Sequence, residues 1–422
     1  MPDDRGTIRQ VAWTELFPWL ELLRTFRLAI QARLLLLAVV GVLLTFAGWW
    51  VAGKMFGGGD PDAPLQGTIA QYSQGPWIGA AEPTIAEMKR TPPGVLGPRE
   101  VILGPANLAA GENPLLAAWL NLSGPFRLLF APQLTVVGLA FALVCALWVD
   151  LVWAFFGGVI TRLVALQVTR SERGSLRGAV RYVMARYLAY VTAPLFPLFG
   201  VLLFVLPVAL VSLIGHAGSP GLTIVTALWP VFLVAGLVIV IFLIGLLFGW
   251  PLMWPTISSE GTDSFDALSR SYSYVYQRPL HYLWYAIVAS VLGVLGALVV
   301  QYFAAAVLYL TAWAVSWGAG NAVLEDMTEN APLAANILAF WTGLVQVITV
   351  GFIYTFFFSA ATIVYFLLRY DVDGTESDEV FVEEQSEKFG LPPVTTDAAG
   401  VATIADAAPE DEMADNGADV AP

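Results

Sequence analysis

Residues 34–55 read LLLLAVVGVLLTFAGWWVAGKM, and this stretch decides which kind of protein the chain forms. It contains one hydroxyl side chain, Thr45, and one charge, Lys54, near its end. The hydrocarbon core of a bilayer is about 30 Å thick, and a helix crosses it with about 20 mainly apolar residues. The stretch is therefore predicted to be a membrane-spanning helix.

Five further apolar runs follow, at 134–159, 188–214, 222–248, 283–310 and 334–368. The composition agrees with them, because 58% of the 422 residues are hydrophobic and only 13% are charged. Soluble domains average about 45–50% apolar and about 25% charged residues. A soluble globular enzyme is excluded. The predicted fold class is all-α, a polytopic membrane helix bundle of six spans with cytoplasmic interfacial amphipathic helices.

The placement of arginine predicts the orientation of the six spans. Arginines gather before the first span, between the second and third, between the fourth and fifth, and after the sixth: Arg5, Arg9, Arg24, Arg27, Arg33, Arg162, Arg170, Arg173, Arg177, Arg181, Arg186, Arg270, Arg278 and Arg369. With six spans these sites fall on one side. Cytoplasmic loops carry the excess of Lys and Arg, so both termini are expected in the cytoplasm.

The chain is expected to divide into five segments. These are an amphipathic cytoplasmic segment 1–33, the first span 34–56, an external Gly/Pro-rich loop 57–133 with an interfacial helix, a five-span bundle 134–370, and an acidic, largely disordered cytoplasmic tail 371–422. In the external loop, 115–120 and 126–130 look interfacial, and Gly124-Pro125 is expected to interrupt them.

The net charge of −13 belongs to the tail. Residues 371–422 hold 15 acidic residues and one basic residue, while the rest of the chain is close to neutral. An acidic tail is repelled by the anionic inner leaflet and projects into the cytoplasm. It serves either as a docking tail for a basic protein partner or as a solvating tail, and the composition favours the second.

Two segments align without gaps and indicate an internal repeat. SLRGAVR at 175–181 matches SFDALSR at 264–270, and each is predicted to open a short amphipathic helix that runs into a span. The expected apolar stripes are Leu176, Val180, Val183 and Tyr187 in the first copy, and Phe265, Leu268, Tyr272, Val275 and Tyr276 in the second. Asp263 is the expected N-cap of the second helix, and Pro279 marks its break from the next span.

The stretch SFDALSRSY at 264–272, running through Arg278-Pro279-Leu280 into a span, resembles a pattern of a broad bacterial superfamily of polytopic membrane proteins. These proteins are related to the membrane domain of glycerophosphodiester phosphodiesterases. The resemblance covers about residues 160–300. It implies a helical bundle in the bacterial cytoplasmic membrane and carries over no catalytic residue.

The intramembrane polar candidates are Asp150, Gln301 and Gln346, with Thr349 one turn beyond the last. Asp150 lies near the middle of the second span, where an Asp costs about 2.5–3.5 kcal/mol on insertion scales. One interpretation is a proton, cation or substrate site. The other is a hydrogen-bonded clamp between helices, with Gln301 as the expected partner, and such contacts contribute about 0.6–2 kcal/mol. The clamp is favoured, because no span holds a second acidic residue.

Four arginines, Arg170, Arg173, Arg177 and Arg181, recur at helical spacing and are candidates to bind anionic lipid head groups. The alternative is ordinary topology-setting charge. The single Cys145 and the two histidines, His216 and His281, argue against a metal centre, and no catalytic motif occurs. We expect no metal, no cofactor and no nucleic-acid partner.

The leading functional hypothesis is a non-enzymatic scaffold or accessory subunit in the lipid bilayer. A transporter or permease-like protein that uses Asp150 and Gln301 is the alternative, and a membrane-embedded enzyme ranks third. The excess of arginine over lysine is typical of GC-rich bacterial genomes, so the cytoplasmic membrane of a bacterium is the expected location. The oligomeric state is not predicted.

Overall fold

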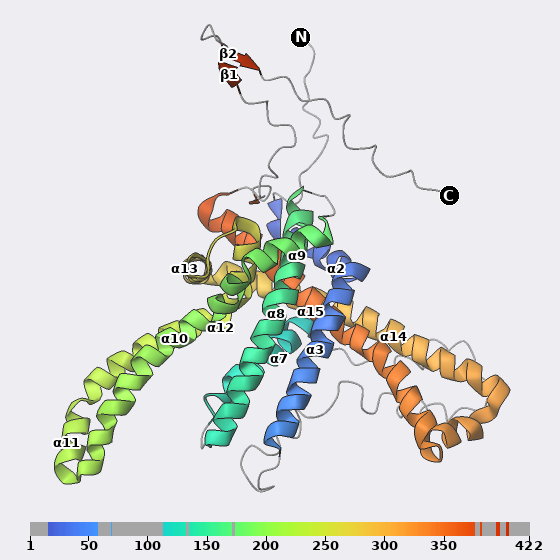
Figure 1. Cartoon of the computed structure of the whole chain (residues 1–422), viewed down its shortest axis with the longest axis horizontal. Coiled ribbons are helices and arrows are strands. Elements are labelled where there is room, and N and C mark those ends of the chain that lie inside the picture. The colour runs from blue at the N-terminus through green and yellow to red at the C-terminus, as the bar shows by residue number, and fades with distance from the viewer. Residues whose placement is uncertain are drawn as a thin grey trace, which may run out of the picture. The chain divides into compact units, whose positions relative to one another are not determined.

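The computed structural model describes residues 16–57, 69, 113–131, 135–170, 174–375, 380–381, 394–396 and 402–404 (Figure 1). The chain forms two compact units, 1–380 and 381–422. The first unit is helical throughout its described part. In the second, β1 (Val394–Thr396) pairs with β2 (Ala402–Ile404) in antiparallel register, with Thr395 opposite Thr403. The rest of the tail that was expected to be disordered lies outside the described residues.

The helices of the first unit follow one another in a regular order of short and long elements. They are η1 (Pro18–Leu23), α2 (Arg24–Ala29), α3 (Ala32–Phe56), α7 (Pro114–Leu128), α8 (Val136–Arg170), α9 (Leu176–Ala185), α10 (Tyr187–Ser212), η2 (Leu213–Ala217), α11 (Ser219–Ala227), α12 (Trp229–Glu260), α13 (Ser264–Gln277), α14 (Pro279–Glu329) and α15 (Pro332–Asp373). A short helical segment therefore precedes α3, α10 and α14. Two of these segments, before α10 and α14, stand where the two copies of the repeat were expected, although the sequence repeat itself stays a prediction.

Six helices in the described part of the chain are long and apolar enough to cross a membrane, which confirms an all-α first unit with six candidate spans. They are α3, α8, α10 with η2, α12, α14 and α15. The predicted fourth span, 222–248, is wrong at both ends. Its first residues belong to the separate helix α11, and α12 continues to Glu260. Pro230 lies at the start of α12, where a proline's missing N–H is not needed.

α8 and α12 run past the ends expected from their apolar patterns because their polar residues pair with each other. Thr161 of α8 and Ser258 of α12 share a hydrogen bond of 2.7 Å between their hydroxyls. Both side chains are fully buried. Hydroxyls that satisfy each other are tolerated inside a bundle, so the helices extend beyond the purely apolar stretch.

α7 corrects the expectation of two interfacial pieces interrupted by Gly124-Pro125. One helix runs from Pro114 to Leu128 through Pro125, and the Asn113 side chain caps its start by accepting from Leu115 N and Leu116 N. Ala118 and Leu122 are buried, and the helix packs against α8, α14 and α15. Its packing thus makes α7 part of the bundle wall.

α9 and α13 are the two short helices that the repeat predicted, and both are capped by side chains. Ser175 Oγ accepts from Gly178 N at 3.1 Å, and Asp263 Oδ1 accepts from Asp266 N at 2.8 Å, which confirms the predicted cap. The predicted apolar stripes are only partly the buried faces. Buried in α9 are Ala179, Tyr182 and Val183, and buried in α13 are Ala267, Ser271, Tyr274 and Val275. Leu176 and Phe265 are exposed, because the helices instead turn inward the faces on which the Tyr182 hydroxyl reaches α12 and the Tyr274 hydroxyl reaches α15. The buried Ser271 bonds within its own helix, to Ala267 O.

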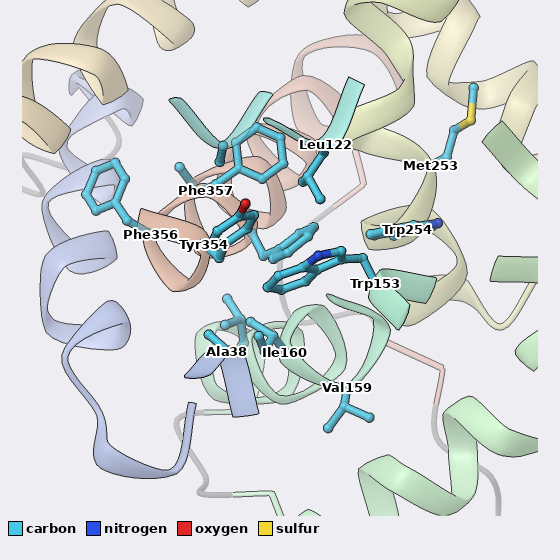
Figure 2. Packing of buried hydrophobic residues seen from close by; sticks show 14 of the residues in the cluster. Ala38, Leu122, Trp153, Val159, Ile160, Met253, Trp254, Tyr354, Phe356 and Phe357 are labelled. Atoms are coloured by element: carbon cyan, nitrogen blue, oxygen red, sulfur yellow. The ribbon is translucent and has the colours of Figure 1, made fainter. Parts of the chain in front are cut away.

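The core is rich in aromatic side chains contributed by α8, α12 and α15 (Figure 2). Trp153 stacks on Tyr354 with ring centroids 4.3 Å apart, and Trp254 stacks on Phe358 at 5.5 Å. Trp153 Nε1 donates to Thr45 Oγ1 of α3 at 3.0 Å. Aromatic pairs add about 0.5–1.5 kcal/mol beyond their buried area, so this layer joins four helices.

Two helical hairpins extend from this core (Figure 1). In the first hairpin, α10 packs along α12, and the short helices η2 and α11 connect the two in that order. In the second, α14 packs along α15. In the most apolar stretches of α10 and α12 only 6% of each stretch is buried inside the protein, whereas 83% of that of α15 is buried. α15 is therefore the central helix of the bundle, and the α10–α12 hairpin presents most of its apolar surface outward.

We expect Gly157→Ala to destabilise the bundle. A Cβ at Gly157 would lie 2.7 Å from Trp254 Cζ3 and 2.9 Å from Phe358 Cζ, two rings that are already stacked. Overpacking of this kind costs about 1–3 kcal/mol. Gly236→Ala in α12 is the matched control, because nothing lies within 4 Å of its Cβ. Thermal melts in mild detergent should show a lowered midpoint for Gly157→Ala alone; equal melts for the two variants would contradict the packing described.

Candidate functional site

Asp150 lines a cavity of about 80 Å³ between α7, α8, α10 and α12. The other walls are almost entirely apolar: Leu122, Ser123, Phe126, Val149, Trp153, Pro194, Leu198, Leu246, Trp250 and Trp254. Trp119 Nε1 of α7 donates to Leu247 O of α12 at 3.2 Å and thereby fixes one side of the cavity. Asp150 lies in α8, one of the six candidate spans, but the sequence did not predict that Trp250 and Trp254 of α12 would line a cavity with it.

Two polar atoms at this cavity have no hydrogen-bond partner among the described residues. They are Oδ2 of Asp150, a residue with 5% exposure, and Nε1 of Trp250. Buried polar groups are nearly always hydrogen-bonded, so a native exception calls for an explanation. Trp153 and Trp254 differ from Trp250 in this respect, because their indole N–H groups donate to Thr45 and to Tyr190 O.

The expected clamp between Asp150 and Gln301 is wrong. Within the described chain no hydrogen bond joins them, and Gln301 Oε1, on α14, is itself buried without a partner. Gln346 is exposed on α15, and Thr349 bonds within its own helix to Val345 O. The polar span residues therefore do not meet at one site, because α8 faces α7, α10 and α12 at the depth of Asp150.

A second polar cluster lies where α12 ends, and sequence reasoning did not find it. Glu260 Oε2 lies 2.7 Å from Arg270 Nη1 of α13, and Glu260 Oε1 lies 3.4 Å from Arg369 Nε of α15. The Tyr365 hydroxyl donates to Glu260 Oε1 as well. The Glu260 and Arg369 side chains are 9% and 10% exposed. The sequence did hold a signal for this cluster. Glu260 is an acidic residue shortly after the fourth apolar run, and Arg369 is the one arginine after the sixth, so the two could have been proposed as an ion pair.

Gly261 lets this carboxylate sit at the end of α12. Its φ of +70° is left-handed, which terminates the helix directly after Glu260. The chain can then turn into α13, whose Arg270 returns to Glu260. Asp266 also contacts Arg270, at 3.3 Å, from one turn earlier in α13.

A buried arginine extends the cluster across α8 and α9. Arg162, with 4% exposure, donates to Ser258 O at 2.5 Å, and its guanidinium lies 3.8 Å from the centroid of the Tyr182 ring. The Tyr182 hydroxyl donates to Ile257 O, and Tyr190 shares a hydrogen bond with the Ser258 hydroxyl. Arg162 was expected to be one of the charges that set topology, yet it binds the last turn of α12.

The first residues of the predicted tail belong to α15. The Tyr274 hydroxyl donates to Asp373 Oδ2 at 2.5 Å, and the Tyr285 hydroxyl donates to Asp371 Oδ2 at 2.9 Å. Burial, and then the hydrogen bond to Asp373, raise the pKa of Tyr274, so its hydroxyl remains a donor at neutral pH. The boundary at 371 is therefore too early, because α15 ends at Asp373 with Gly374 as its left-handed cap.

The four arginines of the predicted lipid-binding stripe do not share one helix. Arg170 ends α8, Arg173 lies outside the described residues, and Arg177 and Arg181 are exposed on α9. The helical spacing is broken because α9 starts anew at its Ser175 cap. Arg177 and Arg181 remain four residues apart on one helix and can face the same head group.

The described residues form six candidate membrane spans, as in a multi-pass membrane protein, together with an apolar cavity that carries a carboxylate and a polar cluster at a helix end. In the described residues no group of three or more His, Cys, Asp and Glu could hold a metal ion. No protein-family model, no curated protein and no solved structure matches the chain. The resemblance of 264–272 to the phosphodiesterase-associated membrane domain therefore stays an expectation.

We expect Glu260→Gln to loosen the bundle. The change removes the carboxylate charge that Arg270 and Arg369 both approach, and breaking a buried ion pair usually costs about 3–5 kcal/mol. Arg270 is 40% exposed and can regain water, so the loss should fall at the lower end of that range. Asp266→Asn is the control, because its exposed pair with Arg270 should contribute at most about 1 kcal/mol. Chemical unfolding of both purified variants measures the difference, and equal stabilities would show that Glu260 does not hold the helices together.

Proposed function

We propose that this protein is a non-catalytic, multi-pass membrane scaffold or accessory subunit, with both termini in the cytoplasm of a bacterial cell. The polar cluster around Glu260 supports the structural part of this role. Its carboxylate, arginine, hydroxyl and carbonyl groups form ion pairs and hydrogen bonds with one another. The cluster thereby joins α8, α12, α13 and α15. Groups that are already paired in this way hold helices together and are poorly placed for chemistry.

The outward apolar surface of the α10–α12 hairpin is the observation that carries the proposal. Leu203 is 70% exposed on α10, and Leu237 is 61% exposed on α12. In a bilayer such faces contact lipid or the helices of another protein. Pro197 and Pro207 interrupt the hydrogen bonding of α10, and neighbouring groups commonly compensate for this in membrane helices. The exposed hairpin is the part of this chain best placed to receive a partner helix.

The positive-inside rule supports the proposed orientation. Arg177 and Arg181 on α9, and Arg270 and Arg278 around α13, belong to the side of the bundle that carries the short helices. These helices then lie at the cytoplasmic interface, where exposed Leu176 and Phe265 meet the membrane surface. Arginines at that depth attract anionic head groups by about 1 kcal/mol each.

The acidic tail adds a second route to a partner. Residues 381–422 form the second unit and hold most of the negative charge. A basic cytoplasmic protein is the partner that this charge suits.

A transporter or permease-like protein is the second candidate, and the cavity at Asp150 favours it. A buried carboxylate without a partner is typical of a substrate or ion pathway. α10 carries Pro194 and Pro197 beside this cavity, and broken helices often surround transport sites. The scaffold ranks first because, in the part of the chain that the structure describes, no second acidic residue lines the cavity.

Cysteine labelling should place α13 and the hairpin ends on opposite sides of the membrane. In a Cys145→Ala background, Gln277→Cys should react with a membrane-impermeant maleimide only after permeabilisation. Ser219→Cys and Asn330→Cys should react in intact cells. All three positions are exposed, and Cys145, the chain's one cysteine, is buried. Labelling of all three positions under the same condition would contradict six spans with cytoplasmic ends.

Photocrosslinking in native membranes tests the scaffold role itself. A diazirine side chain at Leu203 or at Leu237 should yield a product of discrete added mass, because a partner helix covers this face. A diazirine at Val201, on the same helix with 4% exposure, is the control and should give only intramolecular products. Lipid adducts alone at both exposed positions would overturn the accessory role, and a product of twice the chain mass would assign the face to a second copy instead.

A further inference from the structure

The cavity at Asp150 exposes polar atoms that have no hydrogen-bond partner among the described residues, so a ligand in the cavity could bind to them. Asp150 Oδ2 offers an acceptor and Trp250 Nε1 offers a donor, and both lack a partner. The Ser123 hydroxyl on the same wall already donates to Trp119 O at 2.7 Å, so toward the cavity it offers lone pairs. Two acceptors and one donor thus meet in a space whose other walls are hydrocarbon and aromatic.

The charge of Asp150 selects among possible occupants. An ionised carboxylate in apolar surroundings is costly unless a cation pairs with it. An anion would be repelled, and a purely apolar molecule would leave the carboxyl unsatisfied. Among the described residues no partner reaches Asp150 Oδ2, and Arg162, three turns further along α8, is bound to Ser258 O and the Tyr182 ring. A cation for Asp150 must therefore come from outside the described part of the chain.

The tryptophans favour an organic cation over a metal ion. Trp153, Trp250 and Trp254 line the cavity, and aromatic faces attract ammonium groups by about 0.5–2 kcal/mol. A metal ion would require several oxygen or nitrogen ligands, whereas Asp150 is the sole carboxylate that the described residues place on these walls. Binding sites of this composition hold an apolar body and orient it with a few polar groups.

Size and position restrict the ligand further. A cavity of about 80 Å³ is smaller than the engineered cavity of about 150 Å³ that holds benzene, so the head of the ligand must be compact. Phe126, Pro194 and Leu198 on its α7 and α10 walls are partly exposed and apolar. An alkyl chain can pass between these side chains toward the hydrophobic surroundings of the hairpin.

We propose that this cavity binds a lipid-soluble primary amine, with its ammonium group on Asp150 and its alkyl chain leaving between α7 and α10. The Trp250 ring and its two neighbouring tryptophans surround the first carbons. The ligand enters as the neutral amine from the apolar side, where that form is soluble. The proton of the neutral Asp150 carboxyl then moves to the amine nitrogen, so that the ammonium and the carboxylate form together as a pair. This binding requires neither transport nor a protein partner, so it stands apart from the scaffold role.

Three six-carbon probes test the proposal on the full-length protein in mild detergent. Hexylamine, 1-hexanol and hexanoate share a chain and differ in their head groups. Equilibrium dialysis with radiolabelled hexylamine should show saturable binding of one molecule per chain. Hexanol should bind at least about tenfold more weakly, and hexanoate should not compete. Equal binding of hexylamine and hexanol, or uptake that does not saturate beyond detergent alone, would overturn the proposal.

Variants locate the site and separate binding from folding. Asp150→Asn keeps the shape of the side chain but removes its charge, and it should lower hexylamine affinity at least about tenfold. Gln346→Leu, an exposed position on α15, is the matched control and should bind like the wild type. Leu198→Trp fills the cavity while leaving Asp150 in place, and it should abolish binding as well. Thermal melts verify that each variant is folded. Wild-type affinity in a folded Asp150→Asn or Leu198→Trp variant would show that hexylamine binds elsewhere.

Discussion

The paired charges of Glu260 are the interaction on which the arrangement of the helices depends. One carboxylate at the end of α12 meets Arg270 from α13, Arg369 from α15 and the Tyr365 hydroxyl. A buried carboxylate with a single partner would be a poor source of stability, because desolvation offsets the attraction. With several donors from two helices, it fixes where those helices lie relative to α12. Arg162 does the same for α8 by binding the carbonyl of Ser258, two residues earlier in α12.

The helices pack most tightly near the ion pairs of Glu260, and the packing becomes looser with distance along the hairpins. Close to Glu260, aromatic rings from α8, α12 and α15 stack, and Gly157 makes room for them. Farther along α10 and α12 the side chains contact mainly each other, and most of their apolar surface is open. In water such surface would drive aggregation, whereas in a bilayer it is solvated by lipid. The same protein therefore combines a tightly joined end with a loosely partnered hairpin, and it is the hairpin that suits an accessory role.

The cavity at Asp150 lies between the tightly packed end of the bundle near Glu260 and the exposed α10–α12 hairpin. Around the anchor, polar groups are paired, but at the cavity Asp150 and Trp250 remain open. The stability of the bundle does not explain these two groups, since an apolar side chain would fill the position of Asp150 at lower cost. A bound ammonium donor does explain the open Asp150 oxygen, and this is why the cavity differs in kind from the cluster around Glu260.

The sequence by itself determined the six long apolar helices and their suitability for a membrane, because both depend on local quantities. Twenty apolar residues in a row span a bilayer whatever surrounds them. Caps such as Asp263 and breaks such as Pro279 act on their own backbone, and both stand where they were predicted. Tertiary structure decided the partners. It separated Asp150 from Gln301, moved the ends of α12 and α15 past the apolar runs, and brought Glu260 to Arg369 across 109 residues. Which side chains meet depends on how helices rotate and pack against each other. That choice is made by the sum of many weak contacts across the bundle, which no single stretch of sequence contains.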